Sequence, residues 1–153
     1  FTWEVRRYSL SALGALHAPS GGDDPAASQS GDVDYEFALS TGAPFTFWGL
    51  NGFNAQRIAY RYRPGIRPSE ASVDATIGLN WGPDWITMLK STTENSIGRT
   101  PSPRGHYWSS KAEFSVVHRL QPGFAIETST FRTFLGRNVL KETGFKVAFW
   151  YGF

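Results

Sequence analysis

The sequence of 153 residues contains no cysteine and only one methionine. The absence of a thiol excludes disulfide scaffolds, zinc ribbons, iron–sulfur sites and thiol catalysis within these residues. Charged residues are also scarce, at 18%, whereas twelve Phe, six Tyr and six Trp make the chain rich in aromatic side chains. Aromatic residues are enriched in strands, so this composition favours an all-β protein over a helical bundle.

Long hydrophobic runs are absent as well, because no stretch approaches the roughly 20 apolar residues that a membrane-spanning helix needs. A membrane β-barrel is compatible with the sequence, since its strands alternate apolar and polar side chains. The net charge is only +2 and the basic residues are interspersed with acids. No nucleic-acid partner is therefore expected.

Apolar and polar residues alternate with a period of two, which is the spacing of a half-buried strand. The clearest case spans residues 32–41, where Tyr35, Phe37 and Leu39 share one face and Asp34 and Glu36 the other. An irregular FTFWGLNGFN predicts a bulge at Gly49 or Gly52. The pattern predicts a single domain over residues 1–153 with eight strands, at 8–16, 32–41, 45–63, 73–81, 85–94, 111–119, 124–133 and 141–153.

The predicted connections alternate in length. Those at 17–31, 64–70 and 94–106 are long, those at 42–44, 82–84 and 121–123 are short, and 134–140 is intermediate. In an up-and-down barrel, successive connections emerge at opposite rims, and outer-membrane barrels have short periplasmic turns and long outer loops. The sequence thus predicts an all-β, antiparallel up-and-down transmembrane β-barrel of about eight strands.

The last predicted strand has an apolar or aromatic residue at every second position: Phe145, Val147, Phe149, Tyr151 and Phe153. This pattern resembles the C-terminal signature of Gram-negative outer-membrane β-barrel proteins. The resemblance implies that these residues form a membrane-assembly signal for the outer-membrane assembly machinery. It also implies export to the bacterial outer membrane and a periplasmic C-terminus.

In size and strand number the chain is similar to the small barrels of the OmpA and OmpX type. Its stretches IAYRYRPGIRPSEASVDATIGLNWGPDWITML and FRTFLGRNVLKETGFKVAFWYGF resemble the closing strands of longer, uncharacterised outer-membrane proteins of alphaproteobacteria. The strand-like FTWEVRRYSL at the start fits the C-terminal portion of such a larger barrel. The alternative fold is a soluble β-sandwich binding module whose edge strand ends in Phe.

If the apolar faces contact lipid, the polar faces line the barrel interior. Charges of opposite sign then alternate from strand to strand and can pair across a narrow lumen, which predicts a polar plug without an open pore. With further strands, the same residues would line a passage for small polar or anionic solutes, with Arg57 and Arg61 as anion contacts. The predicted lumen network comprises Arg7, Asp34, Glu36, Arg57, Arg61, Asp74, Lys90, Lys111, Glu113, Arg119, Glu127, Glu142 and Lys146.

Trp residues at predicted strand ends suit the interfacial girdles of a barrel. These interfacial aromatics are Trp3, Trp48, Trp81, Trp85 and Trp108. The expected partners are outer-membrane lipid and lipopolysaccharide, whose phosphates Arg99 and Arg104 could contact. The sequence identifies no protein partner beyond the assembly machinery.

Catalytic and metal-binding motifs are weak. His106 lies close in sequence to Ser109 and Ser110, but GxSxG and HExxH motifs are absent. A lipid-modifying hydrolase or acyltransferase is kept only as an alternative to a non-enzymatic anchor, scaffold or binding protein. Residues 21–24, Asp32 and Asp34 lack EF-hand spacing, so neither a metal nor another cofactor is expected.

Overall fold

The computed structural model describes residues 2–5, 8–18, 33–64, 68–98 and 106–152. Within these ranges the chain forms antiparallel strands and turns, without helices. The strands are β1 (Thr2–Val5), β2 (Tyr8–His17), β3 (Asp34–Phe47), β4 (Leu50–Tyr62), β5 (Ser69–Trp81), β6 (Trp85–Ile97), β7 (Trp108–Gln121), β8 (Phe124–Arg137) and β9 (Thr143–Tyr151).

The strands form one meander in which each pairs antiparallel with the next, in the order β1 to β9. The eight predicted strands correspond to β2–β9, and β1 is a short addition that pairs with the first residues of β2. The all-β, antiparallel up-and-down arrangement is therefore confirmed. Among the described residues, no pairing joins β9 to β1 or β2, so both edges of the sheet have a neighbour on one side only.

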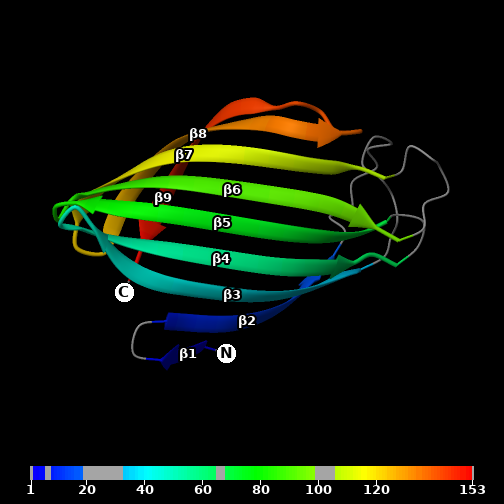
Figure 1. The fold of residues 1–153 in the computed structure, drawn as a ribbon, viewed down its shortest axis with the longest axis horizontal. Coiled ribbons are helices and arrows are strands. Elements are labelled where there is room, and N and C mark those ends of the chain that lie inside the picture. Colours follow the sequence, from blue (N-terminus) through cyan, green and yellow to red (C-terminus); the bar gives the residue numbers. More distant parts are fainter. Residues whose placement is uncertain (1, 6–7, 19–32, 65–67, 99–105, 153) are drawn as a thin grey trace.

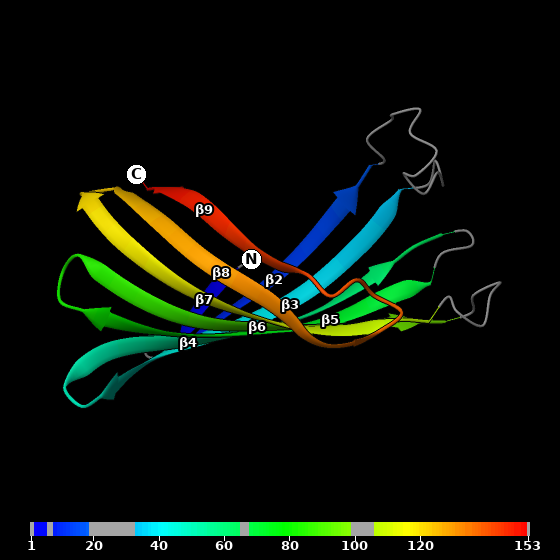
Figure 2. The same ribbon diagram turned by 90° about the horizontal axis from the view of Figure 1, so that it is seen from above.

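The sheet is strongly curved. Strands β3 to β6 form its near side in Figure 1, and the sheet bends through β7 and β8 to place β9 behind them. The perpendicular view in Figure 2 separates β9 from β4 and shows β2 and β9 inclined in opposite directions. We call the inner surface of this curve the concave face and its outer surface the convex face.

Short turns and long connections lie at opposite ends of the sheet (Figure 1). The turns after β3, β5 and β7 leave only two or three residues between strands, whereas the connections after β2, β4, β6 and β8 are longer. The alternation of connection lengths predicted from the sequence is thus present in the fold. We refer to the two ends as the short-turn end and the long-loop end.

The turn between β3 and β4 lies elsewhere than the predicted 42–44. Strand β3 continues through that segment, with Gly42 opposite Ala55 and Pro44 opposite Phe53. Pro44 lies beyond the last β2 pair, where β3 has one described neighbour and a missing N–H is tolerated. The actual turn is Trp48–Gly49, with φ of 48° and 79°. Positive φ at both central residues matches the strand twist in a two-residue hairpin. The predicted bulge at Gly49 or Gly52 is therefore wrong, because Gly49 is a turn residue and Gly52 pairs with Phe45 in a continuous register.

The two faces of the sheet differ in polarity. Directly paired residues share a face, so Glu36, Arg61 and Glu70 lie together on the concave face. Glu36 is 6% exposed, whereas the adjacent Phe37 on the convex face is 65% exposed. Other exposed apolar residues of the convex face include Leu10, Leu39, Ile58, Val73, Ile77, Leu89, Phe114, Phe145 and Val147.

A small apolar core fills the concave face toward the short-turn end. It consists of the buried residues Ile86, Met88, Val117 and Ala125, with Phe53 packed against them. Phe53 also lies over its register partner Gly78, so that a Cβ at Gly78 would overlap the phenyl ring. Aromatic side chains over a facing glycine are a known device for curved sheets.

Candidate functional site

Glu36 on β3 lies at the centre of an ion-pair network that spans β2 to β5. Arg61 donates from Nε and Nη2 to Glu36 Oε2, at 3.0 and 2.6 Å. Arg57 binds Glu36 Oε1 with one guanidinium nitrogen and donates from Nη1 to Asp74 Oδ2 at 3.1 Å. His17 Nε2 lies 3.3 Å from Glu36 Oε2. Glu36 is thereby contacted by three side chains from two neighbouring strands.

The network continues toward the long-loop end. Arg63 Nη2 lies 2.5 Å from Glu70 Oε2, and Arg63 Nε lies 3.4 Å from Asp34 Oδ2. The Tyr107 hydroxyl donates to Glu70 and accepts a hydrogen bond from Arg63 Nη1 at 3.2 Å. We call this cluster the arginine network: His17, Asp34, Glu36, Arg57, Arg61, Arg63, Glu70, Asp74 and Tyr107.

A second ion-pair network joins β6 to β9. Lys90 Nζ lies 2.5 Å from Glu127 Oε1 and 3.1 Å from Glu113 Oε1. Lys146 Nζ lies 2.7 Å from the same oxygen of Glu113. Trp150 donates from Nε1 to Glu127 Oε2 at 2.9 Å. We call Lys90, Glu113, Glu127, Lys146 and Trp150 the lysine network.

Both networks consist of closely balanced opposite charges. The Glu36 and Glu127 side chains are only 7% and 5% exposed, and each contacts at least one base. Removing a charge from water costs several kcal/mol unless a partner of opposite charge compensates it. Loss of one partner of a buried ion pair therefore destabilises a folded protein by about 3–5 kcal/mol. The concave face is therefore filled by polar side chains, whose acidic and basic groups form ion pairs with one another.

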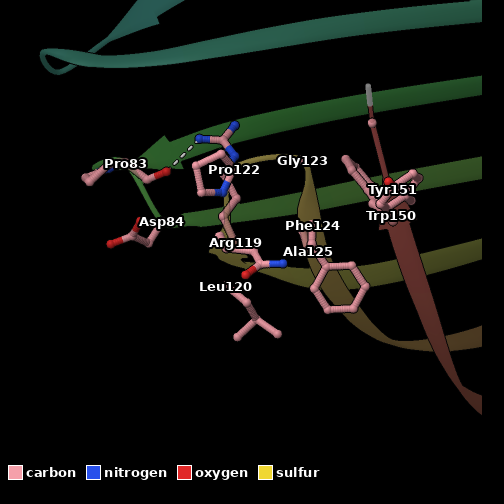
Figure 3. Close-up of a pocket in the computed structure, with 12 residues that line it drawn as sticks. Pro83, Asp84, Arg119, Leu120, Pro122, Gly123, Phe124, Ala125, Trp150 and Tyr151 are labelled. Atoms are coloured by element: carbon pink, nitrogen blue, oxygen red, sulfur yellow. Dashed lines mark hydrogen bonds between the residues drawn. The ribbon is translucent and has the colours of Figure 1, made fainter.

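The concave residues near the two ends are more exposed. Lys111 Nζ lies 3.0 Å from Glu142 Oε2 toward the long-loop end, and both side chains are more than one-third exposed. Toward the short-turn end, Arg119 donates from Nη1 to the Pro83 carbonyl at 2.7 Å. Arg119 also lines a recess of about 610 Å³ between the 82–84 turn, the 121–123 turn and the end of β9 (Figure 3). Trp150 and Tyr151 form the β9 side of this recess.

The structure brings together most of the charges that the sequence assigned to one interior. The assigned residues that lie on the concave face are Asp34, Glu36, Arg57, Arg61, Asp74, Lys90, Lys111, Glu113, Arg119, Glu127, Glu142 and Lys146. Arg7 lies outside the described residues.

Sequence reasoning missed five members of the networks, namely His17, Arg63, Glu70, Tyr107 and Trp150. Arg63 continues the alternation of Arg57 and Arg61, so the signal for it was present. Glu70 was placed in a predicted loop at 64–70, whereas β5 begins at Ser69.

The convex face has aromatic side chains at both ends. At the short-turn end Trp81 and Trp85 are directly paired, and the Trp85 ring stacks on His118 with ring centroids 4.1 Å apart. Trp48 stacks on Phe47 in the first short turn. Trp108 lies at the opposite end, at the start of β7. Trp3 is in β1, but its side chain is outside the described part of the structure.

The residues of the expected assembly signal share the convex face of β9. Phe145, Val147 and Phe149 alternate there and are exposed, and Phe149 stacks against Phe124 of β8 with centroids 6.2 Å apart. Tyr151 is also exposed. Phe153 lies outside the described residues.

The histidine considered for catalysis lies beside a different serine. His106 Nδ1 is 3.5 Å from Ser96 Oγ, which accepts a hydrogen bond from the Tyr107 backbone at 2.8 Å. Ser110 Oγ instead lies 2.9 Å from Thr93 Oγ1. Arg99, Arg104, Asp32 and residues 21–24 fall outside the described ranges.

In the described part of the chain, no three His, Asp or Glu side chains are grouped so that they could hold a metal ion. The same residues include no helix with the length and apolar character needed to cross a membrane. Comparisons with protein-family models, curated proteins and solved structures find no match for this chain.

Proposed function

We propose that this chain is an integral β-barrel protein of the Gram-negative outer membrane with a non-enzymatic anchoring, scaffolding or binding role. In this proposal the convex face contacts lipid and the concave face becomes a salt-bridged interior. The observation that carries it is the inverted polarity of the sheet. Phe37 is 65% exposed on the convex face, whereas Glu36 and Glu127 are 6% and 4% exposed on the concave face.

This distribution opposes that of a water-soluble domain. Soluble proteins rarely expose large contiguous apolar patches. Here exposed Leu39, Ile58 and Val73 are register neighbours across three successive strands. An apolar solvent around the convex face removes the cost of exposing this surface.

Strand length agrees with a membrane crossing. Strands β3 to β8 each contain 13 or 14 residues. A strand tilted by about 45° needs only about 9–11 residues to cross the hydrocarbon core. The remaining residues extend into the two interfaces, where Trp85 and Trp108 would mark the boundaries at opposite ends.

The proposal also assigns an orientation and partners. Outer-membrane barrels place their short turns in the periplasm and their long loops outside. The short-turn end, with the turns at Trp48–Gly49 and 82–84, would then face the periplasm. The partners are outer-membrane lipid and lipopolysaccharide, and the assembly machinery would recognise the apolar face of β9 during insertion.

Membrane insertion requires the two sheet edges to find partners. Each unpaired backbone N–H or C=O group in hydrocarbon costs several kcal/mol of free energy. A β-sheet therefore spans a bilayer only when its edges are closed. We therefore propose that β9 pairs in the membrane with the β1–β2 edge, either directly with β2 beyond Tyr8–Ser11, the segment that β1 occupies, or through further strands. The antiparallel meander fits direct closure, because β2 and β9 run in opposite directions along the sheet.

The test uses the absence of native cysteine, which permits single labelling sites. Val73→Cys on the convex face and Ser72→Cys on the concave face differ by one strand position. Each variant is labelled with an environment-sensitive fluorophore and reconstituted into vesicles that contain nitroxide-labelled lipid. We expect strong quenching at position 73 and weak quenching at position 72, because only the former contacts lipid.

Gel mobility provides the accompanying measurement on the membrane fraction. A folded barrel resists SDS until it is boiled, so its band is expected to shift on heating. Protein that stays in the soluble fraction, with equal and weak quenching at both positions, would overturn the membrane proposal in favour of the soluble alternative.

A further inference from the structure

The charges on the convex face are few, and at strand positions they are all basic. Arg132 and Arg137 lie on β8, where they pair in register with Ala112 and Trp108 of the convex face. Lys141 follows in the connection to β9 and is exposed. In contrast, the acidic residues of the strands lie on the concave face wherever the structure describes their side chains. Examples are Glu36, Asp74, Glu113 and Glu127.

These three cations have no acidic partner in the described part of the chain. Arg132, Arg137 and Lys141 are exposed, and none of them forms an ion pair or side-chain hydrogen bond with a described residue. By contrast, Lys90 and Arg57 on the concave face each contact two carboxylates. Within the described part of the chain, Arg132 and Arg137 therefore lie on the convex face without a neutralising carboxylate, and Lys141 is exposed in the connection that follows.

Their position along β8 matches the far boundary of a lipid-contacting band. Strand β8 starts with Phe124 at the short-turn end and finishes with Arg137 at the long-loop end. With a rise of about 3.4 Å per residue and a tilt of about 40°, Arg132 lies roughly 20 Å above Phe124 and Arg137 roughly 33 Å above it. An apolar band of about 25 Å would therefore end between the two arginines, at the depth of lipid phosphates.

The surroundings combine charge with apolar contact surface. Phe134 and Leu135 lie between the two arginines in sequence and are about half exposed. Arg137 also lines a recess of about 370 Å³ together with His106 and Asn138. Phosphates of neighbouring lipids would thus meet the two guanidinium groups separately, while the attached acyl chains lie against the apolar side chains.

We propose that Arg132, Arg137 and Lys141 form a binding site for the phosphate groups of anionic lipids on the long-loop side of the membrane. Arginine suits this ligand because its planar guanidinium can donate two parallel hydrogen bonds to phosphate oxygens. The inference rests on the proposed function, since it needs the convex face to contact lipid.

The test is native mass spectrometry of the folded full chain, released from neutral detergent micelles with equal amounts of phosphatidylglycerol and phosphatidylcholine. We expect phosphatidylglycerol to be retained about tenfold more than phosphatidylcholine, because each basic residue near a lipid surface strengthens the attraction to anionic headgroups. The variant R132Q/R137Q/K141Q should lose this preference. The matched control is K111Q/R119Q, which removes two cations of the concave face and should retain it.

Folding of each variant is checked by the heat-dependent gel shift, so that a loss of lipid preference is assigned only to folded protein. An unchanged preference in the folded triple variant would overturn the inference while leaving the membrane proposal intact. Retention of inorganic phosphate by the wild type, without any preference among lipids, would also overturn it and point to a soluble anion. Failure of the wild type to show the gel shift would instead contradict the proposed function itself.

Discussion

Lys90 on β6 and Glu127 on β8 form an ion pair with an Nζ–Oε1 distance of 2.5 Å, although β7 separates their strands. Adjacent strands lie about 4.8 Å apart, so two strand spacings place the backbones nearly 10 Å from each other. The side chains meet because they converge on the inside of the curve. The same curvature brings Trp150 of β9 to the other oxygen of Glu127.

Replacing Lys90 by Met should strongly destabilise the folded state. The substitution leaves the nearly buried Glu127 without its basic partner, and breaking a buried pair in this way costs about 3–5 kcal/mol. The measurement is the urea midpoint of the protein folded in lipid vesicles, followed by Trp fluorescence. Lys111→Met is the control, because its partner Glu142 is 54% exposed and the expected loss is at most about 1 kcal/mol. Equal losses in the two variants would contradict the special role of the buried pair.

Adding one methyl group at Gly78 should also reduce stability. The new Cβ of Gly78→Ala would overlap the Phe53 ring, which would have to leave the Ile86 and Met88 core. Overpacking of this kind costs about 1–3 kcal/mol. Gly14→Ala is the matched control, because its Cβ would meet no atom within 4 Å. Thermal unfolding of both variants, compared with the wild type, checks the prediction, and a neutral Gly78→Ala would disprove the close packing.

The Trp48–Gly49 turn predicts different tolerance at its two positions. Gly49→Ala should lower stability by about 1–2 kcal/mol, because an L side chain at φ 79° clashes with its own backbone. Trp48→Asn should be tolerated by the turn itself, since Asn accepts positive φ at this position. Urea unfolding in detergent compares them. A larger loss for Trp48→Asn than for Gly49→Ala would show that stacking of Trp48 on Phe47 outweighs the backbone conformation.

The paired concave charges predict that the reconstituted protein conducts no ions. Arg57, Arg61 and Lys90 are each held by carboxylates within hydrogen-bonding distance, so they leave little mobile charge on the concave face. Planar-bilayer recordings should therefore show no discrete current steps above the protein-free baseline. Stable steps that require the folded protein would instead support a passage for small solutes, with the arginine network along its wall.

The location of a strand and the orientation of its two faces were predictable where apolar and polar residues alternate regularly. Alternation such as Tyr35–Glu36–Phe37 sets the faces of a strand, because successive side chains point to opposite sides. The hairpin after β3 was not predictable from the same pattern. The Gly42–Pro44 segment has turn-forming residues, but the tertiary pairing with β4 overrides their local preference.

The charged residues of the candidate site were largely predictable, whereas their contacts were not. Direct partners such as Arg57 and Asp74 follow from strand order and register. Contacts that skip a strand, such as Lys90 with Glu127, depend on curvature, which no local sequence pattern encodes. The proposed role of Arg132 was not predictable from the sequence either. A single basic residue on an apolar face suggests a contact with lipid phosphate only once its position along β8 is known.

The separation of short turns from long connections gives the molecule unequal tolerance to change at its two ends. Tight turns such as Trp48–Gly49 fix the register of the strand pairs, so an insertion there would displace whole ladders. At the other end, after Tyr62 or Arg137, the strands have already completed their pairing. Foreign peptides inserted on that side would be displayed together on one surface, which would make the sheet a carrier whose recognition surface can diversify while its framework stays constant.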